Sequence, residues 1–147
     1  MLKTIPPVLT PDLLWVLAAM GHGDRLAVVN ANYPAYSRHG RVIPLAGVSL
    51  VDAAGAILQL MPLDDIGGQP ACRMVPDGKP DDVAQVHVDM QRVLDAAEGR
   101  AVRMQAVDRT AFFQLAGDAF AAVHVTDNRP FGCFVFTKGV VRAATAT

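Results

Sequence analysis

Cysteine is scarce in this 147-residue sequence, which contains only Cys72 and Cys133. The two are far apart and lack the spacing typical of metal ligands. Reduced thiols in a cytoplasmic protein are the simplest interpretation of this pattern.

An excess of either charge is also missing, since 13 basic residues face 14 acidic ones and leave a formal net charge of −1. This balance gives no electrostatic reason to expect a nucleic acid or an anionic membrane as a partner. No apolar run approaches the length of a membrane span. The first ten residues, MLKTIPPVLT, contain two prolines and no long apolar run, so we do not expect a signal peptide.

Familiar cofactor and nucleophile motifs are absent as well. The segments Gly21-His22-Gly23 and Gly67-Gly68 lack the pattern that surrounds a phosphate loop or a dinucleotide fingerprint, and there is no serine-nucleophile elbow. Three further histidines show no pairing that suggests a metal: His39, His87 and His124. His87 stands beside Asp89 on a predicted helix, where we expect a surface residue. The sequence therefore predicts neither a metal nor a cofactor.

Apolar residues, by contrast, are plentiful, because 52% of the chain is hydrophobic although only 6% is aromatic. The length is that of a single domain, residues 1–147, and the sequence shows no internal repeat, low-complexity tract or linker. Excess apolar surface on a compact chain is often covered by another subunit, so we expect a homo-oligomer.

The pattern along the chain predicts alternating helices and strands. Thr10, Pro11 and Asp12 form a helix start, and Gly21 is expected to end that helix in a left-handed conformation. Pro44 places its strand at an edge of the sheet. The predicted helices cover residues 11–20, 49–61, 81–98 and 109–118, and the predicted strands cover residues 26–29, 42–45, 71–75, 101–107, 120–126 and 132–137. This order is typical of a single α/β domain with a mixed or largely parallel sheet flanked by helices.

His22 lies between two glycines where the first helix ends. One interpretation is a polar residue near a helix end, where a protonated imidazole interacts favourably with the helix dipole. The other is a general acid or base, because imidazole both accepts and donates a proton near neutral pH. The flanking glycines would let a ligand approach the backbone and reach the ring.

Further polar residues stand where ligands often bind in α/β proteins. Asn30, Asn32 and Tyr33 follow the first predicted strand. The side-chain amides of the two asparagines both donate and accept, which suits a neutral hydroxylated ligand such as a sugar, although Asn-x-Tyr-Pro is equally good turn chemistry. Arg109 opens a helix, where a cation opposes the dipole. It is either a solvated surface residue or a partner for a ligand oxygen or a carboxylate across an interface.

Several separated segments resemble the RbsD/FucU family of D-ribose pyranases and L-fucose mutarotases, and its fucose branch in particular. They are the opening MLKTIPPVLTPDLLWVLAAMGHGD, the loop NANYPA, and the closing DRTAFFQLAGDAFAAVHVTDNRPFGCFVFTKGV. Their order along the chain makes the match more specific than any one segment, and it is weakest between about residues 66 and 100.

The resemblance implies an α/β subunit in a ring-based homodecamer with sites at subunit interfaces. It also implies an activity without a cofactor, the interconversion of the anomers of a free monosaccharide. His22 matches the catalytic histidine of the family, and Arg109 matches a substrate-binding arginine. The remaining substrate-binding positions of the family fall on Asn30, Phe131, Gly132 and Cys133.

Three of these positions depart from the family pattern, which has aspartate at 30, tyrosine at 131 and asparagine at 133. Asn30 lacks the charge of a carboxylate, Phe131 lacks a phenol, and Cys133 lacks the paired donor and acceptor of an amide. Positions 131 and 133 are two apart and are expected on one face of a strand. Either the chain is a sugar mutarotase in which His22 acts with water, Tyr33 or Tyr36, or it is a non-catalytic or repurposed member that binds a sugar or another small molecule. A purely structural ring-forming protein explains neither His22 nor the loop.

Overall fold

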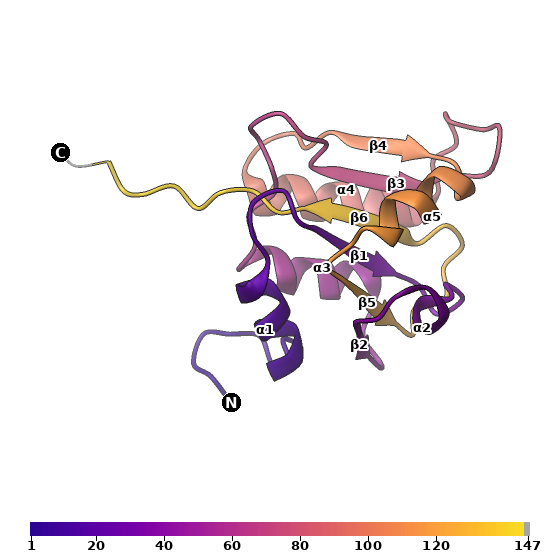
Figure 1. The fold of residues 1–147 in the computed structure, drawn as a ribbon. Coiled ribbons are helices and arrows are strands. Elements are labelled where there is room, and N and C mark those ends of the chain that lie inside the picture. The colour runs from indigo at the N-terminus through magenta and orange to yellow at the C-terminus, as the bar shows by residue number, and fades with distance from the viewer. Residues whose placement is uncertain (146–147) are drawn as a thin grey trace.

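Within the part of the chain that the structure describes, six strands form one twisted sheet that is flanked by five helices (Figure 1). The computed structural model describes residues 1–145. The helices are α1 (Pro11–Ala19), α2 (Ala35–Arg38), α3 (Leu50–Leu58), α4 (Gln85–Glu98) and α5 (Arg109–Gly117), and the strands are β1 (Arg25–Val29), β2 (Val42–Leu45), β3 (Ala71–Met74), β4 (Met104–Val107), β5 (Ala121–Val125) and β6 (Cys133–Thr137). None of the helices in residues 1–145 is long and apolar enough to cross a bilayer.

The sheet has the strand order β2-β5-β1-β6-β3-β4 and is mixed, which confirms the predicted class. β6 is antiparallel to both of its neighbours, β1 and β3, whereas the other neighbouring pairs are parallel. The carboxyl ends of five strands therefore meet at one edge of the sheet, together with the amino end of β6. Pro44 lies in β2 at the outer edge, as predicted, because proline has no N–H to donate to a second neighbour.

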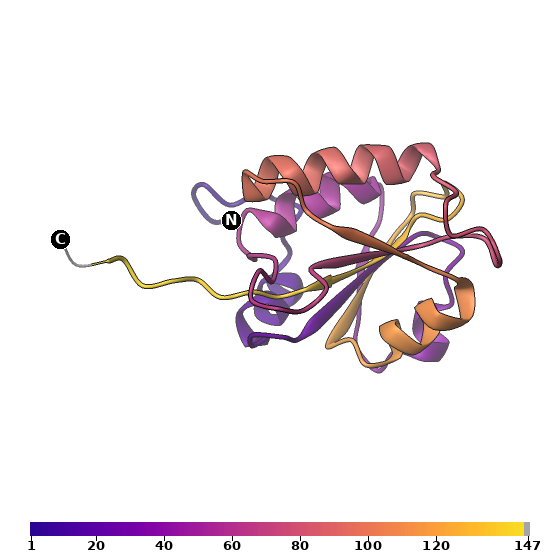
Figure 2. The ribbon, with the colours of Figure 1, turned by 90° about the horizontal axis from the view of Figure 1, so that it is seen from above.

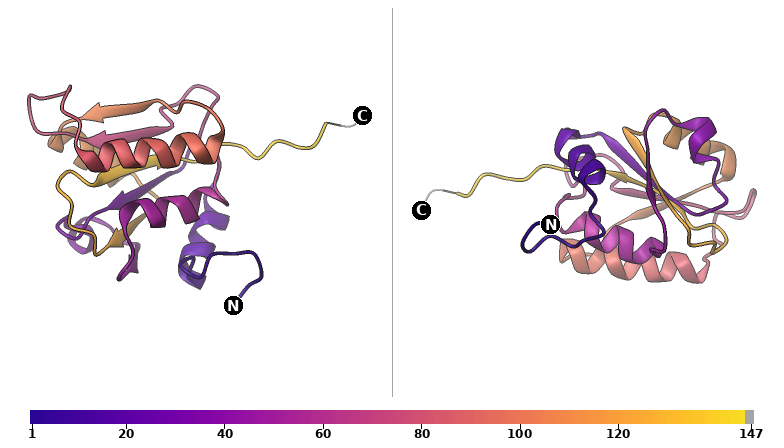
Figure 3. Two further views of the ribbon diagram at one scale, coloured as in Figure 1. Left: turned by 180° about the vertical axis from the view of Figure 1, so that it is seen from behind. Right: turned by 90° about the horizontal axis from the view of Figure 1, so that it is seen from below.

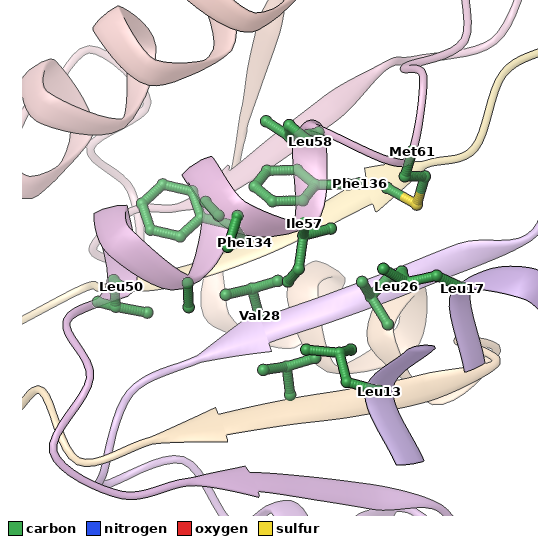
Figure 4. Packing of buried hydrophobic residues seen from close by; sticks show 14 of the residues in the cluster. Leu13, Leu17, Leu26, Val28, Leu50, Ile57, Leu58, Met61, Phe134 and Phe136 are labelled. Atoms are coloured by element: carbon green, nitrogen blue, oxygen red, sulfur yellow. The ribbon is translucent and has the colours of Figure 1, made fainter. Parts of the chain in front are cut away.

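Helices cover both faces of the sheet, with α1, α3 and α4 on one side and α2 and α5 on the other (Figures 2 and 3). A hydrophobic core lies on each face of the sheet, and successive side chains of β1 point into one core and then the other. Leu26 and Val28 face the first group of helices, and Ala27 faces the second. Figure 4 shows the larger core, in which Leu26 and Val28 lie near Phe134, Phe136 and side chains of α1 and α3. After Arg25 the remaining residues of β1, 26–29, are all apolar, because both faces of the strand are buried there.

Side-chain caps fix the helix starts where the sequence predicted them. The hydroxyl of Thr10 accepts from the N–H of Leu13 at the start of α1, and the carboxylate of Asp108 accepts from the N–H of Ala111 at the start of α5. The helix predicted from residue 81 begins later, at Gln85, because Asp82 N–H donates to the carbonyl of Lys79 and closes a turn there.

The end of α1 differs from the prediction. Met20 ends the helix in an extended conformation, with φ −64° and ψ 138°, and Gly21 is not left-handed. The ammonium group of Lys138 donates to the carbonyls of Leu17 and Met20, so a side chain from the end of β6 caps the helix in place of a glycine.

His87 was predicted to be a surface residue, and this is wrong. Its side chain is only 2% exposed, and both ring nitrogens are engaged. Nδ1 accepts from the N–H of Ala84 at 3.0 Å, and Nε2 lies 3.0 Å from the carbonyl oxygen of Phe131. The ring is buried because α4 packs onto the sheet through this face, beside Val86 and Met90.

The burial of His87 predicts that the protein loses stability at mildly acidic pH. Burial, and secondarily the charge of Arg73, hold the pKa of His87 below its ordinary value. The unfolded chain then binds a proton near pH 6.5 that the folded chain resists, so the free energy of unfolding falls as the pH drops below about 6.5, by at most about 1.4 kcal/mol per pH unit. Denaturant titrations between pH 7.5 and 5 at one protein concentration measure this slope. His87→Gln should reduce it, and a flat profile in the wild type would contradict the prediction.

Candidate functional site

His22 lies on a turn between α1 and β1 that is held at several points. The N–H of Gly21 donates to the carboxylate of Asp24 at 2.7 Å, and the N–H of Gly23 donates to the carbonyl of Lys138 at 2.9 Å. The N–H of Lys138 donates in return to the carbonyl of Asp24 at 2.8 Å. Gly23, with φ 86°, is the residue that needs a left-handed conformation. The histidine therefore projects from an ordered turn.

The ring of His22 pairs with a carboxylate from a distant part of the chain. Its Nε2 lies 3.1 Å from Oδ1 of Asp64, and the side chains are 46% and 6% exposed, respectively. A carboxylate only accepts hydrogen bonds when it is ionised, so the neutral ring carries its proton on Nε2. Nδ1 is then unprotonated and free to accept a proton from a ligand.

Asp64 is well placed to remain ionised. Burial alone would raise its pKa, but the N–H groups of Ile66 and Gly68 and the ring of His22 outweigh this effect and hold the pKa below its ordinary value. The sequence analysis did not identify Asp64. It lies 42 positions from His22, so no local pattern joins the two. The only local signal is the run Asp64-Asp65-Ile66-Gly67-Gly68, a short acidic and glycine-rich loop.

A pocket of about 240 Å³ with both polar and apolar lining residues opens beside this pair, on the face of the sheet that α5 covers. Asp64 and Gly23 line it together with Arg25, Gln69 and Gln105. Oε1 of Gln69 is buried and finds no hydrogen-bond partner among residues 1–145. No group of three His, Cys, Asp or Glu side chains in the same described range could hold a metal ion.

The other predicted site residues gather at the opposite edge of the sheet. Asn30 follows the carboxyl end of β1, and Arg109 follows the carboxyl end of β4. Phe131 and Gly132 precede β6, and Cys133 is its first residue. The structure thus brings these five positions to one edge and places His22 at the other. β1 alone separates the edges by roughly 17 Å, at about 3.3 Å per residue.

The side chain of Asn30 is buried, and both atoms of its amide form hydrogen bonds within the chain. Its Nδ2 donates to the carbonyl of Arg129 at 3.0 Å, and its Oδ1 accepts from the N–H of Tyr33 at 3.1 Å. The thiol of Cys133 points to the same oxygen, with an Sγ to Oδ1 distance of 3.7 Å. An aspartate could not donate to the Arg129 carbonyl, so asparagine suits this local arrangement.

Cys133 and Phe131 both pack in the smaller core, between the sheet and α5, as expected for two side chains on one face of the sheet. Burial raises the pKa of the Cys133 thiol to about 11, which keeps it protonated. Phe131 has a positive φ of 58°. A side chain on Gly132 would collide with Leu50, so the glycine is required by packing.

Arg109 and the two tyrosines complete this edge. The Arg109 side chain is exposed, with its guanidinium 5.4 Å from the ring centre of Phe113. The buried hydroxyl of Tyr33 lies 2.8 Å from Nε2 of His39, and burial is the main reason that the pKa of Tyr33 rises to about 12. Tyr36 is exposed. Both tyrosines follow β1, so neither lies near His22 of the same chain.

Comparison with known proteins identifies the family. The model of the RbsD / FucU transport protein family matches residues 3–141. The chain belongs to the RbsD/FucU family. It is 40% identical over 147 residues to a fucose mutarotase of Danio rerio, a match that covers 95% of this chain and 94% of that protein. It is 33% identical over 141 residues to an L-fucose mutarotase of Histophilus somni, a match that covers 95% of this chain and 97% of that protein.

A solved structure of a fucose mutarotase has the same fold. The fucose mutarotase of Streptococcus pneumoniae in complex with L-fucose superposes with a TM-score of 0.87 at 30% identity, covering 96% of this chain and all of that one. The extent of this match confirms the α/β architecture that the resemblance implied for the subunit.

Proposed function

We propose that this protein is a mutarotase, an isomerase that interconverts the anomers of a free monosaccharide such as L-fucose or a related sugar. The relatives named fucose mutarotase support the reaction. The pairing of His22 with Asp64 is the observation that carries the proposal, because it supplies a half-exposed ring with one nitrogen fixed and the other free. The free cysteines, Cys72 and Cys133, are compatible with a reducing cytoplasm.

The reaction opens and recloses a cyclic hemiacetal. Nδ1 of His22 takes the proton of the anomeric hydroxyl, the bond between the anomeric carbon and the ring oxygen breaks, and a proton is returned to the ring oxygen. Rotation about the neighbouring carbon–carbon bond and the reverse steps give the other anomer. The ionised Asp64 stabilises the imidazolium that forms between the two transfers and holds the ring in place.

Because His22 and the other predicted residues occupy opposite edges, the proposed site needs two copies of the chain. His22 of one copy would meet Asn30, Arg109, Phe131, Gly132 and Cys133 of a second. This arrangement fits the homo-oligomer, a decamer by family resemblance, with the sugar held between copies. Water or the exposed Tyr36 of the second copy would donate the proton that the ring oxygen receives.

Saturation-transfer NMR of anomer exchange tests the proposal, with L-fucose, D-ribose and a panel of other free sugars. Faster exchange with one sugar than in buffer establishes the activity and its substrate class. No acceleration with any sugar would overturn the mutarotase assignment.

A non-catalytic sugar-binding or small-molecule-binding role is the second candidate. It is favoured by the closed hydrogen bonding of Asn30 and by the protonated thiol of Cys133, which leave little acid–base chemistry at that edge. If the mutarotase has only been weakened, the combined change Asn30→Asp, Phe131→Tyr and Cys133→Asn should raise the exchange rate. Unchanged exchange together with wild-type binding of a ligand would favour the second candidate.

Gly68→Ala should impair the enzyme without touching a reacting group. A side chain at this position would collide with Oδ2 of Asp64, so the carboxylate and the ring of His22 must shift. A displacement of about 1 Å at a catalytic group can lower the rate on the order of 10²-fold. The exchange rate of the variant checks this, with Gly67→Ala as the matched control, because a side chain at Gly67 meets nothing within 4 Å. Equal rates in the two variants would contradict the prediction.

A further inference from the structure

The segment between β5 and β6, residues 126–132, carries two of the predicted sugar-binding residues and is tied to three other elements. Oδ2 of Asp127 accepts from the N–H of Leu50 at the start of α3. The guanidinium of Arg129 pairs with the carboxylate of Asp89 in α4 at 2.8 Å. The backbone carbonyl of Arg129 accepts a hydrogen bond from the side-chain amide of Asn30, which follows β1. These contacts fix the first half of the segment.

The second half contains an unusual backbone conformation. Phe131 has φ 58°, a left-handed value that a bulky aromatic residue adopts only when its surroundings impose it. On its carboxyl side, Gly132 is confined by Leu50 and by the carbonyl of Arg129. The orientation of Phe131 and of the following Cys133 therefore depends on what holds the peptide between residues 131 and 132.

His87 of α4 supplies that contact. The N–H of Ala84 donates to Nδ1, so the neutral ring carries its proton on Nε2 and donates it to the carbonyl of Phe131 at 3.0 Å. The ring also packs at right angles against Phe134, with centroids 5.9 Å apart, which restricts its rotation. The ring lies on the face of the sheet opposite to α5, so His87 itself cannot reach a sugar held at the α5 face.

We propose that His87 is a positioning residue for sugar binding, which sets the orientation of Phe131 and Cys133 through its hydrogen bond to the Phe131 carbonyl. This role rests on the proposed function, in which that segment contacts the sugar. It differs from simple core packing, because it depends on one donor atom at one position of the ring.

Two matched variants distinguish the hydrogen bond of Nδ1 of His87 from the hydrogen bond of Nε2. In His87→Gln, the amide nitrogen reaches the position of Nε2 and can still donate to Phe131. In His87→Asn, the amide is one methylene shorter, so it can replace Nδ1 toward Ala84 but cannot reach Phe131. Both variants remove the ring and one of its two hydrogen bonds: His87→Gln keeps the contact to Phe131, and His87→Asn keeps the contact to Ala84.

The rate of thiol labelling at Cys133 reports how well residues 131–133 are held in place, and this measurement does not depend on catalysis. Iodoacetamide modification, resolved by peptide mass spectrometry, compares Cys133 with Cys72, which is buried in the adjacent strand β3 and serves as an internal control. Loss of one hydrogen bond should speed labelling of Cys133 relative to Cys72 roughly three- to tenfold in His87→Asn, and not in His87→Gln. A variant that only loosens the whole fold speeds both thiols alike, and that result would overturn the proposal.

Kinetics of anomer exchange give the second readout on the same proteins. We expect KM to rise roughly three- to tenfold in His87→Asn with kcat nearly unchanged, and His87→Gln to restore the wild-type KM. Equal KM in both variants would overturn the role in sugar binding. If the wild type accelerates no sugar while Cys133 responds as expected, the proposed function fails and the positioning of the segment by His87 stands.

Discussion

Replacing His22 by glutamine should lower kcat for anomer exchange by about 10²- to 10⁴-fold, the usual range for loss of a general acid or base. Glutamine retains a hydrogen-bond donor for Asp64 but has no nitrogen that takes up a proton near neutral pH. KM should change little, because the side chains proposed to bind the sugar lie at the other edge of the sheet. Saturation-transfer NMR at several sugar concentrations separates the two constants.

Two further variants make this result specific. Asp64→Asn should lower kcat less than His22→Gln, because the ring remains but loses the charge that stabilises its protonated form. Gly67→Ala, in the loop that carries Asp64, is the control, since a side chain there meets nothing within 4 Å. Exchange that survives His22→Gln within a factor of about two would refute the catalytic role.

Mixing two inactive variants should restore activity. His22→Gln and Arg109→Ala disable opposite edges of the sheet, so each pure protein lacks an intact site if every site is built from two copies. When the two are unfolded together and reassembled in equal amounts, about a quarter of the sites should combine an intact His22 with an intact Arg109. The exchange rate of the mixture relative to wild type measures that fraction.

The matched control mixes two variants of the same edge. His22→Gln and Asp64→Asn act on one pair of side chains in one copy, so their mixture should regain no more than the Asp64→Asn protein itself contributes. Recovery in neither mixture would mean that the site is contained within one chain, and the requirement for two copies would then be wrong.

Local signals in the sequence were sufficient for most of the architecture. Thr10 and Asp108 mark helix starts through hydroxyl and carboxylate caps, and both caps form. Pro44 indicated an edge strand, and β2 is one. These features were predictable because each depends on the residue itself and on neighbours within a few positions.

Long-range contacts were not predictable in the same way. Asp64 meets His22 across 42 positions, and His87 meets Phe131 across 44. Lys138, at the far end of the chain, ends α1 and so displaces Gly21 from the role that local pattern gave it. In each case the partner is chosen by the order of strands in the sheet, which no local spacing encodes.

The central position of β6 has a consequence for how the protein is made. β6 is the last of the strands in residues 1–145, yet it pairs with β1 on one side and β3 on the other. Until it emerges from the ribosome, the nascent chain can form only two partial sheets, β2-β5-β1 and β3-β4, each with an exposed apolar edge open to mispairing. The sheet can therefore close only after β6 has been synthesised and has inserted between β1 and β3.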